Sequence, residues 1–187
     1  KCPKCGSWGT LEQEAQPAVS HGPINEPVRA AVPISGLEVE EQERIPSGID
    51  ELDRVLGGGW VRGGVTLLGG EPGGGKSTLL LQVCAEMAKR GERVIYISGE
   101  ESSGQLALRG RRLGLMTPGL DLLCESDLPS SLAAAEKYGY GFMVIDSVQA
   151  FRADSESSWA GSPNQVKGVA AMAVDTAKRC SIPTVLV

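Results

Sequence analysis

Apolar residues gather in five short runs along the chain, each about five residues long. The runs occupy residues 64–68, 94–98, 120–124, 142–145 and 183–187. Short apolar runs of this kind are typical of parallel strands that are buried on both faces of a sheet. We therefore expect a strand at each run.

The segments between these runs carry apolar residues at helical spacing. Helices are predicted near residues 102–113, 128–137 and 165–180, and a further helix follows the first run. In that helix the spaced apolar residues are Leu79, Leu80, Val83, Cys84 and Met87, and Gly91 ends it. The alternation of strands and helices predicts an α/β fold with a mostly parallel sheet covered by helices on both faces.

The first 44 residues differ from the remainder. Residues 1–12 contain a cysteine pair, and residues 13–44 are polar and dotted with prolines, which is typical of a linker. The globular core begins near Ile45 and opens with a short helix predicted at residues 50–56. Because the final residues, PTVLV, form a predicted strand with nothing after it, we expect the core over residues 45–187 to be truncated at its C-terminus.

Composition narrows the class of protein. A chain of 187 residues with 41% hydrophobic residues fits one domain with an appended segment. No apolar run approaches the roughly 18 to 20 residues of a membrane span and no signal peptide opens the chain, so we expect a soluble intracellular protein without a membrane partner. The net charge of −5 argues against coating duplex DNA by bulk charge. Basic clusters such as Arg109, Arg111 and Arg112 are interpreted as solvated helix faces, with local binding as the alternative.

The most informative motif lies between the first run and the helix after it. Residues 70–78 read GEPGGGKST, a Gly followed by four residues and then Gly-Lys-Ser. Glycines let consecutive backbone N–H groups curl around a β-phosphate, Lys76 brings a positive charge, and Ser77 brings a hydroxyl to Mg²⁺. A glycine-rich turn without a ligand is the alternative. The motif predicts that ATP contacts Gly70, Glu71, Pro72, Gly73, Gly74, Gly75, Lys76, Ser77 and Thr78.

Further carboxylates follow two of the later runs. Asp146 comes directly after residues 142–145, where phosphate-loop enzymes place the acid that holds Mg²⁺. A carboxylate that only caps the following turn is the alternative. Glu100 and Glu101 follow residues 94–98 through Gly99. One of them is a candidate general base for the attacking water, the alternative being a pair of acids at a helix N-terminus. Because only one of two neighbours can point inward, we favour Glu100.

Several segments together resemble the RecA-like P-loop ATPases. They read IPSGIDELDRVLGGG, GEPGGGKSTLLLQ, YISGEES and VIDSVQ. Within that superfamily the chain most resembles the RadA (Sms) group of bacterial DNA repair proteins, from about residue 45 to 187. The N-terminal KCPKCGSWGTL is similar to the second half of that group's four-cysteine zinc element. The resemblance implies a RecA-like ATPase core over residues 45–187, preceded by half of a zinc knuckle and a flexible linker.

The cysteine pair has the spacing of a zinc knuckle. Cys2 and Cys5 are separated by two residues, so both thiolates can bind one Zn²⁺, and Gly6 permits the tight turn. Two thiolates form half of a site, and we expect the other pair before Lys1 in the intact protein. A redox pair is the alternative, although no thioredoxin-like pattern surrounds it.

The resemblance also implies roles and partners. It assigns Lys76 and Ser77 to the nucleotide and Mg²⁺, Asp146 to the magnesium side and Glu100 to water activation. Residues 151–165 occupy the place of a DNA-binding loop, with Phe151 and Trp159 as candidate stacking groups. The implied function is a DNA repair and recombination ATPase of helicase type that binds single-stranded DNA and promotes branch migration.

The implied partners are single-stranded and branched DNA, a RecA-type recombinase and further copies of the chain in a hexameric ring. The bacterial cytoplasm is the expected location, with a plant organelle as the alternative. A KaiC-like ATPase or autokinase acting on protein is the main rival, because it shares IPSGIDELDRVLGGG and the paired glutamates. A small-molecule kinase is a third class, but it should show an acceptor pocket and a lid.

Overall fold

The fold comes from a computed structural model that describes residues 31–36, 43–152 and 161–187. The chain divides into two units, Lys1–Glu40 and Glu41–Val187. In the first unit the described residues form the short 3₁₀ turn η1 (Ile34–Gly36). Cys2, Cys5 and Trp159 lie outside the described residues, so the hypotheses about them stay predictions.

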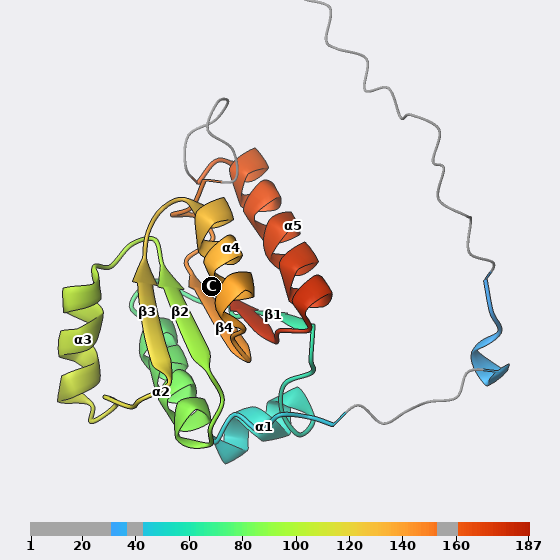
Figure 1. Cartoon of the computed structure of the whole chain (residues 1–187), viewed down its shortest axis with the longest axis horizontal. Coiled ribbons are helices and arrows are strands. Elements are labelled where there is room, and N and C mark those ends of the chain that lie inside the picture. Colours follow the sequence, from blue (N-terminus) through green and yellow to red (C-terminus); the bar gives the residue numbers. More distant parts are fainter. Residues whose placement is uncertain (1–30, 37–42, 153–160) are drawn as a thin grey trace, which may run out of the picture. The chain divides into compact units, whose positions relative to one another are not determined.

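The second unit is built on a parallel sheet, which has five strands among the described residues (Figure 1). Their order across the sheet is β1-β5-β4-β2-β3, and all neighbouring pairs are parallel. The strands are β1 (Val65–Leu67), β2 (Val94–Ser98), β3 (Leu120–Cys124), β4 (Phe142–Asp146) and β5 (Thr184–Leu186). The predicted α/β class with a parallel sheet is confirmed.

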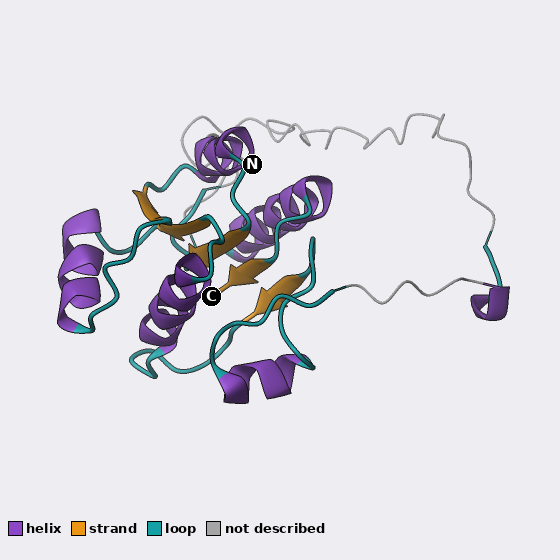
Figure 2. Ribbon diagram, turned by 60° about the horizontal axis from the view of Figure 1, so that its bottom comes forward, coloured by secondary structure: helices purple, strands orange, loops and turns teal. Residues whose placement is uncertain are grey.

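Helices cover both faces of this sheet (Figure 2). One face packs against α1 (Asp50–Leu56), α2 (Lys76–Lys89) and α3 (Ser103–Arg112), and the other against α4 (Leu128–Tyr138) and α5 (Pro163–Cys180). Alternate strand residues face opposite layers, because side chains alternate across a strand. Thus Tyr96 packs on the α2 side and Ile97 on the α4 and α5 side. Both faces of the central strands are buried, as the continuous apolar runs predict.

The helix boundaries follow local capping chemistry. Ser102 caps α3, where its hydroxyl oxygen accepts from the Gln105 N–H at 3.4 Å, and the Gln105 side chain accepts from the Ser102 N–H at 2.9 Å. The structure begins α5 at Pro163, slightly before the predicted residue 165. Ser162 caps this helix, and Pro163 fits its first turn because no N–H is needed there.

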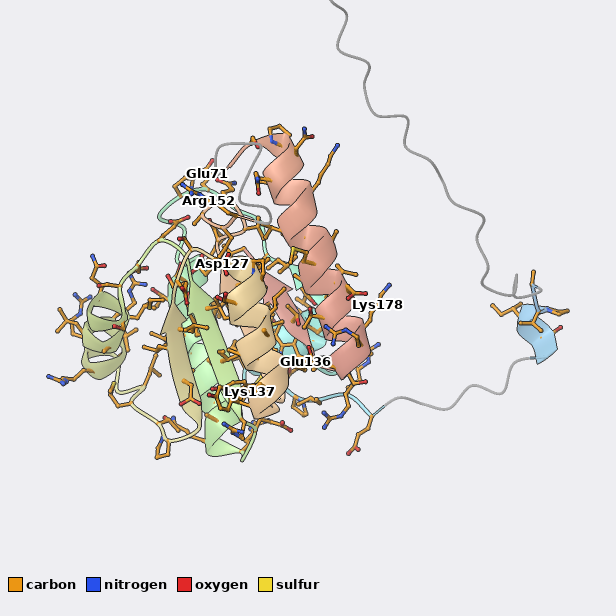
Figure 3. The ribbon with its side chains drawn as sticks, turned by 45° about the horizontal axis from the view of Figure 1, so that its top comes forward. Glu71, Asp127, Glu136, Lys137, Arg152 and Lys178 are labelled. Carbon is orange, nitrogen blue, oxygen red and sulfur yellow. The ribbon has the colours of Figure 1, made fainter. Side chains whose placement is uncertain are left out.

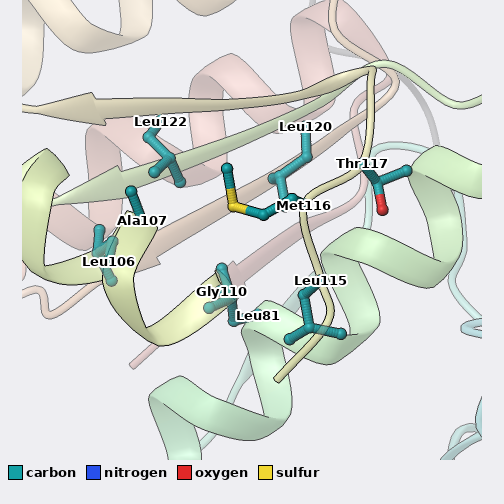
Figure 4. A pocket seen from close by; sticks show the side chains of 9 residues that line it. All are labelled: Leu81, Leu106, Ala107, Gly110, Leu115, Met116, Thr117, Leu120 and Leu122. Atoms are coloured by element: carbon teal, nitrogen blue, oxygen red, sulfur yellow. The ribbon is translucent and has the colours of Figure 1, made fainter. Parts of the chain in front are cut away.

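A small apolar pocket lies where α3 packs beside β3 (Figure 4). Gly110 is buried and faces the Met116 sulfur, and a Cβ at this position would make an ordinary contact with that sulfur at 3.5 Å. The lining residues are Leu81, Leu106, Ala107, Gly110, Leu115, Met116, Thr117, Leu120 and Leu122. This packing holds α3 against α2 and β3, with the start of the helix close to the carboxyl end of β2.

Candidate nucleotide-binding site

Three of the predicted segments meet at the carboxyl ends of the strands. The phosphate loop follows β1, Gly99 and Glu100 follow β2, and Asp146 ends β4. The register places Ser98 beside Asp146, and the Gly99 N–H donates to the Asp146 carbonyl at 2.9 Å. This edge of a parallel sheet is where ligands bind in open α/β folds.

Side chains at the two ends of the sheet can be followed in Figure 3, where Glu71, Asp127 and Arg152 lie at the carboxyl end. Glu136 and Lys137, near the end of α4, lie farther toward the opposite end of the strands. The Asp127 and Arg152 backbones form a parallel bridge, which ties the segment after β4 to the start of α4.

Glycines shape the phosphate loop. Gly73 and Gly75 have φ values of 77° and 83°, which residues with a Cβ rarely adopt. The Gly74 N–H donates to the Glu71 carbonyl at 3.2 Å, and a Cβ on Gly74 would lie 3.1 Å from that same oxygen. A side chain at these positions would therefore distort the turn.

The start of α2 adds positive charge to the loop. The helix begins directly after Gly75 without a side-chain cap, so its first N–H groups and its positive dipole end face the loop. The Lys76 ammonium donates to the carbonyls of Gly70 at 2.9 Å and Glu71 at 3.0 Å, which holds it across the loop. Converging N–H groups beside an ammonium form a cradle that suits a polyphosphate.

The loop opens onto a cleft of about 600 Å³, a size typical of small-molecule sites. Of the predicted residues, Gly70, Pro72, Gly73, Lys76, Ser77, Glu100 and Asp146 line this cleft. A second depression of about 300 Å³ is lined by residues 73–78 together with Arg109. Predicted residues from three separate segments thus line one cleft, whereas Gly74, Gly75 and Thr78 line the second depression and Glu71 lines neither.

The two adjacent glutamates point to different partners. Glu101 accepts from both terminal nitrogens of Arg109 at 2.8 Å, an ion pair whose side chains are 27% and 31% exposed. Glu100 lines the cleft and accepts from the Ser147 hydroxyl. Glu100 is therefore the one of the pair that faces the cleft beside the loop.

Arg109 departs from the solvated face predicted for its cluster. Arg111 and Arg112 are exposed, whereas Arg109 is half-buried in its pair with Glu101 and lines the depression beside the loop. The interpretation as a solvated face is wrong for this residue, because the helix turns it toward the carboxyl end of β2. Sequence spacing alone did not show which of the three arginines faces inward.

Asp146 lies at the base of the cleft with a buried partner. Only 9% of Asp146 is exposed, and one of its carboxylate oxygens accepts from the Tyr96 hydroxyl. Burial raises the pKa of Tyr96 above its usual range, and the charge of Asp146 raises it further. The phenol therefore stays protonated and remains a donor to the carboxylate.

The donor set suits magnesium at this position. Mg²⁺ is usually held by one or two protein oxygens together with phosphates and waters, and Ser77 and Asp146 offer such oxygens in one cleft. When bound, the ion would supply positive charge to the β- and γ-phosphate oxygens. In the described part of the chain, no group of three or more His, Cys, Asp or Glu side chains is placed to hold a metal ion by itself.

The prediction that Phe151 stacks on DNA is wrong. Its ring is fully buried in the core beside α4 and α5, and a Cβ on Gly99 would lie 3.1 Å from it. The backbone directs Phe151 into the core at the carboxyl edge of the sheet, where its ring packs beside Gly99, the residue before Glu100. Arg152 is exposed, and its N–H donates to the Ser126 carbonyl at 3.1 Å.

Sequence reasoning missed three residues of the site. They are Tyr96, Ser147 and Arg109, which contact Asp146, Glu100 and Glu101 respectively. A signal existed for Tyr96, since a hydroxyl within an apolar run must find a buried partner. For the other two residues the partner becomes apparent only from the fold.

A loop of this form, with a strand-end acid and a cleft carboxylate, defines a P-loop ATPase of the RecA-like class. Residues 45–120 match the family model described as "ATPase: KaiC". The whole chain is 41% identical to the DNA repair protein RadA of Aquifex aeolicus, of which it covers 42%. It is also similar over its whole length to the DNA repair proteins RadA of Bacillus subtilis (40% identity, 42% of that protein) and Mycobacterium tuberculosis (41% identity, 40% of that protein).

These similarities support a RadA-type protein of the RecA-like ATPase superfamily. The chain spans about two fifths of the length of these relatives. Among the described helices, none is long and apolar enough to cross a membrane.

Proposed function

We propose that this chain binds ATP with Mg²⁺ in the cleft and hydrolyses it as part of a DNA repair and recombination protein. The observation that carries the proposal is the convergence of Lys76, Ser77, Asp146 and Glu100 on one cleft from three segments far apart in sequence. A positive cradle, two oxygen donors and a carboxylate base are the parts that ATP hydrolysis needs.

The proposed roles follow from position. The N–H groups of residues 73–78 and the Lys76 ammonium hold the phosphates, while Ser77 and Asp146 hold the magnesium ion and its waters. Glu100 orients a water toward the γ-phosphate, with its carboxylate positioned by the Ser147 hydroxyl. Glu101 does not share this task, because Arg109 occupies both of its oxygens.

The DNA part of the proposal rests on the relatives. Each is named as a DNA repair protein, and the similarity covers the whole of this chain. We therefore propose binding of single-stranded and branched DNA, helicase-type branch migration, cooperation with a RecA-type recombinase and a hexameric ring. Exposed Arg152 lies in residues 151–165, the candidate contact segment, and the net charge of −5 means that such contact must be local.

The N-terminal segment belongs to the same proposal. Residues 1–12 would supply two thiolates, Cys2 and Cys5, to a zinc site completed by residues outside this chain, and residues 13–44 would link it to the core at residues 45–187. The bacterial sources of the relatives favour the bacterial cytoplasm as the location.

ATP hydrolysis measured with and without single-stranded DNA tests the proposal. The protein should be used at the full length of its gene product, with Lys76→Ala as the control for contaminating ATPase. We expect DNA to stimulate turnover, and the stimulation to fade as salt rises because phosphate contacts are screened. A rate of ATP hydrolysis that DNA leaves unchanged at every salt concentration would contradict the DNA role and favour a KaiC-like ATPase that acts on protein.

Movement on DNA needs a separate assay. A labelled three-stranded junction should be resolved in the presence of ATP and protein, and should persist with Lys76→Ala or without Mg²⁺. Hydrolysis stimulated by DNA without any strand displacement would contradict the helicase part alone.

A further inference from the structure

Tyr96 is a buried polar residue that the proposed roles do not use. It lies in the middle of β2, is fully buried and packs on the α2 side of the sheet among apolar residues. A hydroxyl in such a layer is costly unless it has hydrogen-bond partners. Its hydrogen-bond partner, Asp146, belongs to the candidate magnesium site.

The phenol bridges two neighbouring strands at that site. The Tyr96 hydroxyl, on β2, donates to Oδ2 of Asp146, at the end of β4. The hydrogen bond therefore ties the carboxylate to a fully buried residue of the core.

The same hydrogen bond fixes how Asp146 faces the cleft. The phenol occupies one of the two carboxylate oxygens and leaves the other for the water shell of a magnesium ion. Ser77, the other candidate oxygen donor, lines the same cleft.

We propose that Tyr96 is a positioning residue for magnesium, which orients the Asp146 carboxylate through one buried hydroxyl. The inference rests on the proposed function, since it concerns the ion that accompanies ATP. It predicts that the Tyr96 hydroxyl strengthens Mg²⁺ binding without contacting the ion or the nucleotide. Partners of this kind typically change metal affinity by about 10- to 100-fold.

Tyr96→Phe tests this directly, because it keeps the ring and removes the hydroxyl. The probe is a fluorescent ATP analogue, whose affinity is measured first in EDTA and then across a Mg²⁺ titration. We expect unchanged affinity in EDTA and a Mg²⁺ midpoint raised about 10- to 100-fold. An unchanged Mg²⁺ midpoint would overturn the inference, as would an equal loss of affinity with and without Mg²⁺, which indicates a merely structural role.

The chain offers a matched control at another Tyr–Asp pair. The Tyr140 hydroxyl donates to Asp121 at 2.7 Å, and neither residue lines the cleft. Tyr140→Phe should leave both the EDTA affinity and the Mg²⁺ midpoint unchanged. A change in the Mg²⁺ midpoint equal to that of Tyr96→Phe would count against the inference, because the effect would then not require the bridge.

A second measurement needs no change at Tyr96. The chain has three tyrosines, so 3-fluorotyrosine labelling gives three ¹⁹F resonances, which Tyr138→Phe and Tyr140→Phe assign. Adding Mg²⁺ to the nucleotide-bound protein should shift the Tyr96 resonance and leave the other two in place. An unmoved Tyr96 resonance despite Mg²⁺-dependent nucleotide binding overturns the inference alone, whereas absence of any nucleotide binding overturns the proposed function itself.

Discussion

Neutralising the two adjacent glutamates one at a time should lower the rate of catalysis in one case and the stability of the fold in the other. Glu100→Gln keeps the size of the side chain and can still accept from Ser147, but it removes the negative charge that orients water. Loss of a general base typically lowers a rate by about 10²- to 10⁴-fold, or about 2.7 to 5.4 kcal/mol of activation free energy. ATP affinity should be retained, because the cradle of residues 73–78 is untouched.

Glu101→Gln removes a different interaction. Its ion pair with Arg109 is bidentate, but with side chains 27% and 31% exposed it is partly screened by solvent, so we assign it about 1 kcal/mol of folding free energy. For a domain of this size that corresponds to a fall in Tm of roughly 2 to 4 °C. The rate of ATP hydrolysis at saturating ATP should stay within a few-fold of the unsubstituted protein.

The assay is phosphate release at saturating ATP, with ATP binding and thermal melting measured on the same samples. The two variants serve as controls for each other, because they differ only in which carboxylate is neutralised. Normal turnover by Glu100→Gln, or a loss of 10²-fold or more in Glu101→Gln, would refute the assignment of the base to the residue that faces the cleft.

Other substitutions test separate parts of the structure. Lys76→Ala should abolish nucleotide turnover and weaken ATP binding, measured with a fluorescent ATP analogue; full activity would contradict the loop's role. Phe151→Ala should lower the free energy of unfolding in urea by about 3 to 5 kcal/mol, because the ring is fully buried; a change below 1 kcal/mol would contradict that burial. Burial and the bond to Asp121 raise the pKa of Tyr140 to about 12, so the stabilisation from this raised pKa is complete below pH 10 and is lost as pH rises through 12. Melting temperatures of Tyr140→Phe should therefore fall less steeply over that interval, and parallel curves would contradict the shift.

Much of the fold follows from hydrophobic spacing alone. The strands at residues 94–98 and 120–124 and the helix at 50–56 are found within their predicted bounds. They are predictable because each is a compact apolar or amphipathic segment that ends at glycine or polar residues. The start of α5 depended instead on Ser162 and Pro163, whose capping role outweighs hydrophobic spacing.

The site was predictable where its chemistry lies in consecutive residues. The phosphate loop needs a fixed order of glycines, lysine and serine, so residues 70–78 could be proposed as a phosphate loop from the sequence alone. The residues that contact the carboxylates come from distant parts of the chain. The sequence alone does not show which of these parts lie side by side in the fold. Tyr96 meets Asp146 across neighbouring strands, and Arg109 meets Glu101 through the turn of α3.

Phe151 shows the limit of assigning a role from position in a motif. An aromatic residue after a strand-end acid can stack on a ligand or pack into the core, and both uses place it in the same segment. The geometry of Gly99 decides between them, because its lack of a Cβ admits the ring beneath the chain. Gly99 and Phe151 lie far apart in the sequence, so this contact becomes apparent only from the fold.

A structure of the chain with a non-hydrolysable ATP analogue and Mg²⁺ would locate the phosphates, the ion and the candidate base together. We expect the β-phosphate within the N–H groups of residues 73–78, the ion against the Ser77 hydroxyl on the Asp146 side, and Glu100 facing the γ-phosphate with room for one water. A nucleotide bound away from the loop, or Glu101 released from Arg109 and facing the γ-phosphate in place of Glu100, would contradict this expectation.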